Sequence, residues 1–276
     1  MYIIAEIGIN HNGDVALAKQ LINKAARAKC DAVKFQKRNI DLVYSKAELE
    51  APRDSPWGTT TRAQKEGLEF SIGQYKELEE HCAHKKMDFI VSCWDLDSLR
   101  TIENNLNVRF HKVASAMATD AAFLQELNNT GKDIILSVGM LSEEDIAAIV
   151  PRLHNLKYLL ACTSTYPTRV EELNLNHILT LKKCYPQLQV GFSNHYSGHD
   201  ACVAAVALEA ECIEFHITHD RTAYGSDQAA SIENVTSLCR GIRKAQVMLG
   251  NGVKKIYNSE LPIIDKLRKN NTLYSP

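Results

Sequence analysis

The sequence predicts an α/β protein with a single domain, a (β/α)8 TIM barrel. Short runs rich in β-branched and aromatic residues alternate with longer helical runs, eight times each. The chain has 276 residues, which is enough to bury one large core without disulfide or metal staples. A doubly wound sheet is the alternative, but the sequence has no glycine-rich GxGxxG turn.

We expect the strands, in chain order, at 2–9 (YIIAEIGI), 31–36 (DAVKFQ), 87–93 (MDFIVSC), 110–115 (FHKVAS), 132–138 (KDIILSV), 156–162 (LKYLLAC), 188–193 (LQVGFS) and 211–217 (ECIEFHI). The helices between and after them are expected at 14–29, 71–85, 95–105, 120–129, 142–152, 174–184, 198–210 and 230–249.

One long insertion, residues 37–70, separates the second strand from its helix and contains Pro52, Pro56 and Gly58. An insertion after a barrel strand lies at the catalytic end of the barrel, so we expect 37–70 to act as a lid. A short tail, 250–276, follows the last helix and is too short for a second core.

Composition excludes several classes of protein. The 32 basic and 33 acidic residues give a net charge of −1, which argues against non-specific binding to nucleic acid and against a membrane-surface protein. The N-terminus has no basic leader, and no apolar run reaches the roughly 18 residues of a spanning helix. Eight cysteines without a CxxC pair predict reduced, mostly buried thiols in a cytoplasmic protein.

Strand alternation directs polar side chains into the barrel. In the first strand Ile3, Ala5 and Ile7 form the apolar, helix-facing side, so Glu6 points inward. The same rule turns the following residues inward near the carboxyl ends of their strands: Lys34, Gln36, Ser92, Trp94, Ser137, Ser193, Glu214 and His216, with His195 two residues after Ser193. Any one of them can fill the barrel as part of a buried ion pair, but together they predict an active site.

A series of motifs now resembles a known family. The segments AEIGINHNGD, DAVKFQ, LEF, KVASA, ILSVGM, CTSTYP, GFSNH and EFHITHDR, followed by GSDQAASIE, occur in this order. They are similar to motifs of the sialic acid (N-acetylneuraminate) synthase family, and the likeness runs from about residue 3 to about residue 260. The resemblance implies a transferase that condenses phosphoenolpyruvate with an open-chain, N-acetylmannosamine-like aldose, giving a 2-keto-3-deoxy sugar acid and phosphate.

The resemblance also implies roles for individual residues. His195 and His216 would hold a divalent metal, with Mn²⁺ expected, and Glu6 would act near the metal and the reacting carbon. The phosphoenolpyruvate site would comprise Lys34, Gln36, Lys112, Ser115, Ser137, Ser164 and Ser193. Glu214 lies two residues before His216 and points the same way, so we expect it either to orient His216 or to bind the sugar. The candidate catalytic residues are Glu6, Lys34, Glu214, His195 and His216. Lys112 and Ser115 have opposite strand parity, which predicts a bulge or a strand end between them.

The acceptor sugar stays open at this stage. Candidate contacts are Trp94, Tyr166, Arg53, Arg62, Arg221 and Asp227. Ala116, Met117 and Phe215 differ from the residues common in the family, and this puts the identity of the sugar in doubt more than the reaction. The family often forms homodimers in which a C-terminal antifreeze-like domain caps the partner's barrel, and we expect this chain to lack that domain.

Several alternatives remain. The chain could be a synthase of the 3-deoxy-octulosonate or heptulosonate type that uses a phosphorylated sugar, a metal-dependent hydrolase, or a non-catalytic sugar-binding relative. His11 is either a third metal ligand or a residue that stabilises its turn, and the second reading is favoured. His199 is expected to cap a helix or lie at the surface. Trp57 either stacks on a sugar or packs the insertion against the barrel.

Overall fold

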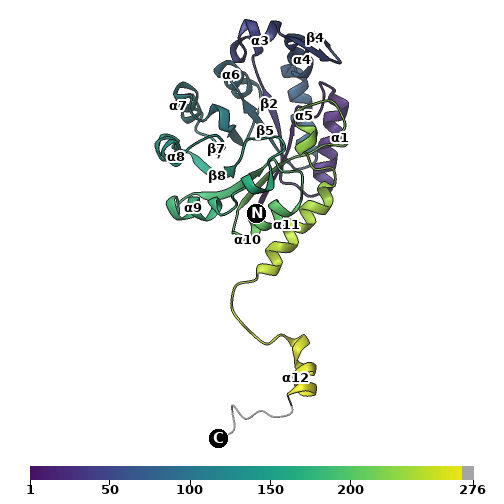
Figure 1. Cartoon of the computed structure of the whole chain (residues 1–276), viewed down its shortest axis with the longest axis vertical. Helices are drawn as coiled ribbons and strands as arrows, with labels where there is room; N and C mark the ends of the chain where they lie inside the picture. The colour runs from purple at the N-terminus through teal and green to yellow at the C-terminus, as the bar shows by residue number, and fades with distance from the viewer. Residues whose placement is uncertain (269–276) are drawn as a thin grey trace.

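Eight parallel strands close the barrel in the order β1-β10-β9-β8-β7-β6-β5-β2. Helices lie around the strands in Figure 1. The structure is a computed structural model, and it describes residues 1–268. Its barrel strands are β1 (Tyr2–Gly8), β2 (Ala32–Lys37), β5 (Asp88–Cys93), β6 (Phe110–Val113), β7 (Asp133–Ser137), β8 (Leu156–Cys162), β9 (Gln189–Asn194) and β10 (Cys212–His216). The predicted fold is confirmed, and each expected strand is present within a few residues.

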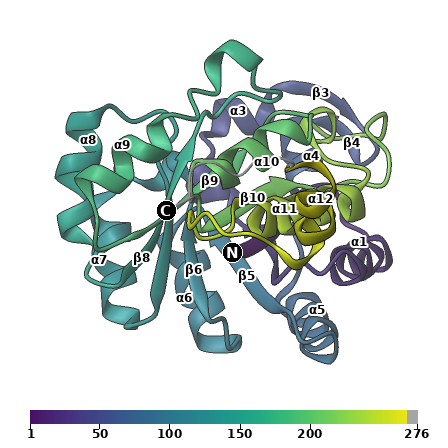
Figure 2. The same ribbon diagram turned by 90° about the horizontal axis from the view of Figure 1, so that it is seen from below.

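Helices alternate with these strands and surround the barrel (Figure 2). They are α1 (Val15–Arg27), α5 (Ile72–His84), α6 (Leu96–Asn105), α7 (Ala121–Thr130), α8 (Glu143–Ile149), α9 (His177–Cys184), α10 (Asp200–Ala207) and α11 (Val235–Leu249). Asp14, Ser71, Asp95, Asp120 and Ser142 begin five of them, and each side chain accepts hydrogen bonds from backbone N–H groups of the first turn.

Two element boundaries differ from the expected ones for identifiable reasons. The first strand ends at Gly8, because this residue has a φ of +56°, in the left-handed region that breaks a strand. The last helix begins at Val235 rather than at residue 230. The residues before it form a short 3₁₀ turn at Gln228–Ala230, and Ile232 then pairs with Ile217 beyond the end of β10.

The core has two layers. The larger one lies between the strands and the helices and contains the alternate residues Ile3, Ala5 and Ile7 of β1. The smaller one fills the barrel interior with Ile4, Ala32, Ile90, Phe110, Ile135, Tyr158, Leu160 and Cys212. These inner residues sit near the amino ends of their strands, so the polar residues two positions further along lie above an apolar floor.

The insertion between β2 and α5 has secondary structure of its own. It contains α2 (Ile40–Val43), α3 (Lys46–Glu50), the antiparallel pair β3 (Pro52–Ser55) and β4 (Gly58–Thr60), and α4 (Thr61–Leu68). Trp57 lies against Gly67, where a Cβ atom would come within 2.1 Å of the indole, and it meets Tyr224 edge-on at 5.5 Å between centroids. Of the two readings of Trp57, the structure supports the one in which it packs the insertion down.

After α11 the tail leaves the barrel and ends in α12 (Leu261–Leu267), which stands apart from the body in Figure 1. The last part of the expected tail, 269–276, lies outside the described residues. Within 1–268, no helix is both long and apolar enough to cross a bilayer. All eight cysteines fall in this range and are free thiols, six of them buried.

Candidate active site

A cavity of about 290 Å³ opens at the carboxyl ends of the barrel strands. It brings together most of the predicted site residues, from all eight strands or the loops that follow them: Glu6, Lys34, Gln36, Trp94, Lys112, Ser115, Ser137, Ser164, Tyr166, Ser193, His195, Glu214 and His216. Ser92, Ala114, Ala116, Met140 and Cys162 complete the lining. The inward direction that strand alternation predicts for these side chains is therefore confirmed.

Four ionisable groups form one buried network at the floor of this cavity. Glu214 Oε1 lies 3.0 Å from Lys34 Nζ, 3.3 Å from Lys112 Nζ and 3.0 Å from the hydroxyl of Ser193. Lys34 Nζ is also 3.3 Å from Glu6 Oε2. The two ammonium groups and two carboxyl groups balance each other before any substrate enters. Glu214 therefore faces the lysines, one layer below His216, and in this structure it does not orient the imidazole as we had considered.

The two carboxyl groups have opposite electrostatic environments. Burial opposes the charge of Glu214, but Lys112 and Lys34 outweigh it and hold the pKa of Glu214 well below its usual range. Glu6 has only one lysine close by, so burial raises its pKa, and the negative charge of Glu214 adds to the rise. Glu214 is the permanent anion of the pair, and Glu6 is the carboxyl group that can take up and release a proton.

The two lysines also differ. Burial disfavours the charge on both, but Glu214 and Glu6 together raise the pKa of Lys34 above its usual value. Lys112 has Glu214 as its close carboxylate and Lys34 as a neighbouring cation, so burial prevails and lowers its pKa. An incoming anion beside Lys112 would supply the second negative charge that this ammonium group lacks.

Several hydroxyl groups line the cavity together with Lys112. β6 ends at Val113 and Ser115 opens a 3₁₀ turn, so the change of parity between Lys112 and Ser115 reflects the strand end that we considered. Ser137 Oγ is buried and has no hydrogen-bond partner among residues 1–268. A Cβ atom at Gly139 would come within 2.2 Å of Ser164 Oγ and 3.0 Å of Ser115 Oγ, so glycine leaves these hydroxyls room to converge.

Two imidazoles lie close together in the same cavity. The ring centroids of His195 and His216 are 5.3 Å apart, and Tyr166 lies against both, at 4.2 Å and 5.5 Å. His195 Nδ1 is 2.8 Å from the carbonyl oxygen of Thr163, a contact that leaves Nε2 free for a ligand. Burial lowers the pKa of His216 to about 3, so its imidazole is neutral at physiological pH.

These imidazoles fit a metal site with open positions. Among the described residues no cluster of three or more His, Cys, Asp or Glu side chains is arranged to hold an ion. The pair offers two nitrogen donors, and Asp227 Oδ2 lies 3.5 Å from His216 Nδ1 without a hydrogen bond in the described structure. Two protein nitrogens with a carboxylate nearby leave room for water or substrate oxygen, as a catalytic rather than a structural site requires.

Cys162 is a cavity residue that the sequence patterns did not single out. Its thiol lines the cavity, 3.7 Å from His195 Nδ1 and 3.7 Å from Ser164 Oγ. Burial opposes the thiolate, but His195 outweighs it and lowers the pKa of Cys162 to about 7. The thiolate in turn raises the pKa of His195 against the effect of burial. Strand alternation could have predicted this position, because Tyr158 and Leu160 of β8 point into the barrel and Cys162 follows two residues after Leu160.

Other predicted residues lie away from the cavity. Arg53 is exposed on β3, Arg62 pairs with Asp41 at 2.7 Å, and Arg221 donates to the backbone carbonyls of Ser197 and Ser231. The insertion that carries the first two lines a neighbouring cavity instead, since the described lining of the central cavity includes none of residues 37–70. A role of this insertion as a lid stays a prediction.

The two other histidines considered as candidates, His11 and His199, also lie outside the cavity. His11 Nδ1 accepts a hydrogen bond from the backbone N–H of Gly13, and its ring stacks on Phe70 at 4.1 Å, which supports the turn-stabilising interpretation. His199 is the residue before α10, but its half-buried side chain makes no capping hydrogen bond to that helix.

The fold and the cavity define a class: a (β/α)8-barrel enzyme whose cavity combines lysines and hydroxyls, which can bind an anion, with two imidazoles. Comparison with known proteins narrows the class. The NeuB family model matches residues 21–254, and the chain belongs to the NeuB family. This family confirms the resemblance to sialic acid synthases, and the chain is an enzyme of that type.

Individual proteins that are similar to this chain support the family assignment. The chain is 36% identical over 275 residues to the N-acetylneuraminate-9-phosphate synthase of Mus musculus, covering 97% of this chain and 76% of that protein. It is also 36% identical over 278 residues to the N,N'-diacetyllegionaminic acid synthase of Campylobacter jejuni, covering 97% and 83%. The N-acetylneuraminic acid (sialic acid) synthetase of Leptospira borgpetersenii superposes with a TM-score of 0.83 at 30% identity, covering 98% and 93%.

Proposed function

We propose that this enzyme condenses phosphoenolpyruvate with an open-chain, N-acetylmannosamine-like aldose to give a nonulosonic acid and inorganic phosphate. The observation that carries the proposal is that one cavity holds two buried lysines, several hydroxyl groups and two imidazoles, with Glu6 3.3 Å from Lys34. In the reaction C3 of phosphoenolpyruvate bonds to the aldehyde carbon, water adds its oxygen at C2, and the phosphate leaves with its bridging oxygen.

The anionic substrate binds beside Lys112, on the hydroxyls of Ser115, Ser137 and Ser164. Three observations support this placement: the unpartnered Ser137 hydroxyl within the described chain, the lowered pKa of buried Lys112, and the room that Gly139 leaves between the hydroxyls. A bound phosphate would satisfy the hydroxyls and pair with the ammonium group. Lys34 and Ser193 join from the Glu214 side of the network.

The aldehyde end of the acceptor lies between Glu6 and the imidazoles. His195 and His216 would hold a divalent cation, with Mn²⁺ proposed, and such an ion supplies Lewis-acid polarisation of the aldehyde oxygen when it is bound. Glu6 is buried, its pKa is raised by that burial, and it is suited to move a proton at the water or the aldehyde oxygen. Trp94 and Tyr166 line the cavity, and Asp227 lies beside His216, so these three are the proposed sugar contacts.

We also propose a cytoplasmic homodimer as the working form. Eight free thiols are typical of a reducing compartment. Size-exclusion chromatography with light scattering measures the oligomeric state directly, and a monomer at micromolar concentration would contradict the dimer.

The reaction is tested by phosphate release in four mixtures of the purified chain. We expect release with phosphoenolpyruvate, N-acetylmannosamine and Mn²⁺ together, and none when any one of them is omitted. His216→Ala should lose both turnover and Mn²⁺ binding in isothermal titration, with an unchanged circular dichroism spectrum. Full activity in the presence of a chelator would exclude the metal role.

The acceptor is tested in the same assay with the free sugar and its 6-phosphate. Relatives named for both phosphorylated and free sugar acids are equally similar to this chain, so the comparison decides between two real alternatives. We expect the higher kcat/KM for the free sugar, and a preference for the phosphate would support the phosphorylated alternative.

A further inference from the structure

A line of contacts leads from Glu6 out of the cavity to Arg38, just beyond the end of β2. Gln36 Nε2 donates to Glu6 Oε1 at 2.7 Å, and the other end of the same amide, Oε1, accepts a hydrogen bond from Arg38 Nη2. The junction is crowded, because a Cβ atom at Gly8 would come within 3.0 Å of Glu6 Oε1 and 3.3 Å of Gln36 Nε2. Gln36 therefore joins the arginine to the carboxyl group.

The chemistry of the guanidinium group fixes the direction of the amide. Arginine can only donate hydrogen bonds, so it selects the oxygen end of the Gln36 side chain. The NH₂ end must then face Glu6, where it donates to the carboxyl group. Without the arginine the amide could rotate by half a turn and present its oxygen to Glu6, which would remove this donor.

Arg38 is itself held on several sides. Its guanidinium carbon lies 4.3 Å from the centroid of the Trp94 ring, in a cation–π contact. Glu69 Oε1 is 3.8 Å from Arg38 Nη1, and Glu69 Oε2 accepts from the Arg38 backbone N–H at 3.2 Å and from Lys37 Nζ at 3.0 Å. Only 12% of the Arg38 side chain is exposed, so its position is well defined.

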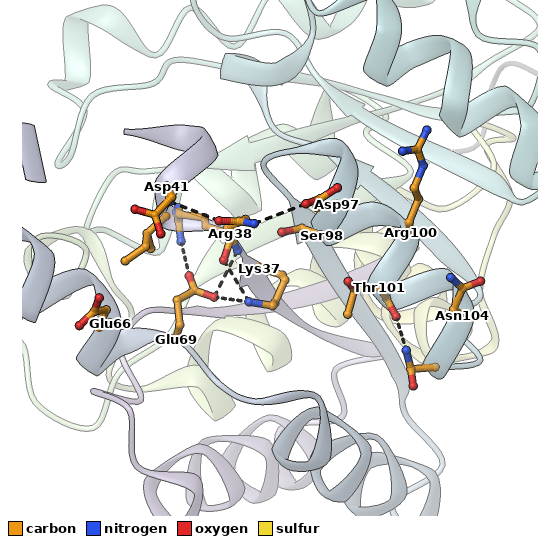
Figure 3. Close-up of a pocket in the computed structure, with 13 residues that line it drawn as sticks. Lys37, Arg38, Asp41, Glu66, Glu69, Asp97, Ser98, Arg100, Thr101 and Asn104 are labelled. Atoms are coloured by element: carbon orange, nitrogen blue, oxygen red, sulfur yellow. Dashed lines mark hydrogen bonds and ion pairs between the residues drawn. The ribbon is translucent and has the colours of Figure 1, made fainter. Parts of the chain in front are cut away.

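Arg38 stands between two cavities. Gln36 and Trp94, which it contacts, line the central cavity. Arg38, Lys37 and Glu69 line a second, charged cavity of about 660 Å³ between the insertion and α6, shown in Figure 3. The insertion thus reaches the active site through Glu69, Arg38 and Gln36, although its own residues lie outside the central cavity.

We infer that Arg38 is a positioning residue for the proposed reaction. It fixes the amide of Gln36 so that this amide keeps donating a hydrogen bond to Glu6, the carboxyl group proposed to act at the sugar substrate. The inference rests on the proposed function. Both ends of the Gln36 amide are engaged, by Glu6 and by Arg38, so we place Gln36 with Glu6 rather than in the phosphoenolpyruvate site where it was expected. The proposed anion site beside Lys112 then involves neither Gln36 nor Arg38, so the kinetic constants for the two substrates can change separately. Loss of Arg38 should lower kcat and leave the KM for phosphoenolpyruvate nearly unchanged.

The test compares Arg38→Met, which keeps the bulk and removes the donors, with Arg38→Lys, which keeps a cationic donor. We expect Arg38→Met to lower kcat by about tenfold to a hundredfold, the range for one hydrogen bond to a charged group, with less than a twofold change in the KM for phosphoenolpyruvate. Arg38→Lys should recover part of the loss. Arg100→Met is the matched control, because Arg100 lines the same second cavity but pairs with Glu126 at 2.9 Å.

A double-mutant cycle with Gln36→Ala decides between positioning and mere packing. If Arg38 acts through Gln36, Arg38→Met should change kcat by less than twofold once Gln36 is Ala. An equal loss in both backgrounds overturns the inference, as does an Arg38→Met enzyme with unchanged kcat. If Arg38→Met fails to fold, Arg38→Lys carries the same cycle. An inactive wild type would instead refute the proposed function itself.

Discussion

Glu214 is the group on which the charge balance of the barrel depends. Replacing it by Gln keeps the shape of the side chain and removes the negative charge that Lys34 and Lys112 share at 3.0 and 3.3 Å. In Glu214→Gln these two buried ammonium groups are left with Glu6, which lies 3.3 Å from Lys34 only. Both lysine side chains are almost fully buried, so water cannot solvate the two ammonium groups in place of the lost carboxylate.

The magnitude follows from this loss of a buried partner. Removing one member of a buried ion pair costs about 3–5 kcal/mol, and we expect the lower end because the amide oxygen can still accept from Lys34. A loss of about 3 kcal/mol lowers the Tm of a chain of this size by roughly 6–12 °C. Differential scanning fluorimetry measures the shift. Inorganic phosphate, bound beside Lys112, should raise the Tm of the variant more than that of the wild type.

The control is Asp133→Asn, which breaks the ion pair with Lys157 on the barrel surface. The side chains of this pair are 42% and 35% exposed, so its loss should cost less than about 1 kcal/mol. If Glu214→Gln melts within one degree of the wild type, or if phosphate stabilises both proteins equally, the charge network does not work as described.

Two further predictions concern small, local features. Gly139→Ala should raise the KM for phosphoenolpyruvate by about tenfold or more with the fold intact, because the new methyl group would lie 3.0 Å from Ser115 Oγ and 2.2 Å from Ser164 Oγ and would displace both hydroxyls. Gly73→Ala, on an open face of α5, is the control. Equal KM values for Gly139→Ala and the wild type would refute the placement of the substrate on these hydroxyls. Burial lowers the pKa of His11 to about 3, so the unfolded chain takes up this proton near pH 6.5 and the folded chain does not. The free energy of unfolding should therefore fall by about 1.4 kcal/mol per unit between pH 6.5 and 3, relative to His11→Asn. Parallel pH profiles of urea unfolding would contradict this.

Eight alternating strand and helix runs predicted the barrel, and the alternation of side chains within each strand predicted most of the cavity, because each buried strand imposes a strict rule. Val33 and Phe35 had to pack against helices, which left Lys34 and Gln36 inside, and the structure agrees. The same rule explains Glu214 and His216 on β10. A period of two residues fixes direction for every residue of a strand at once, so a few apolar positions determine the polar ones.

Alternation could not supply contacts between loops. The insertion folds through local caps at Asn39, Ser45 and Thr60 and a short hairpin. Arg62 was expected near the sugar, but Asp41 in α2 pairs with it. Such contacts depend on how helices of only a few residues pack, which no periodic pattern in the chain encodes.

The buried charge network also explains why Glu6 and Glu214 differ in protonation, which the sequence left open. Both carboxyl groups point inward, and only the distances show that Glu214 has two lysines and Glu6 one. The pKa directions of the two groups follow from that count and from burial. Residue type and direction were readable in the sequence, whereas partner number depends on the three-dimensional stagger of neighbouring strands.

The central claim is that the cavity joins the three carbons of phosphoenolpyruvate to an aldose. The most direct measurement is ¹³C NMR of the product formed from phosphoenolpyruvate labelled at C3, with N-acetylmannosamine and Mn²⁺. We expect a labelled methylene carbon bonded to the former aldehyde carbon of the sugar, formed in equal amount to the released phosphate. Labelled pyruvate with an unchanged sugar would show hydrolysis without condensation and would contradict the proposed reaction.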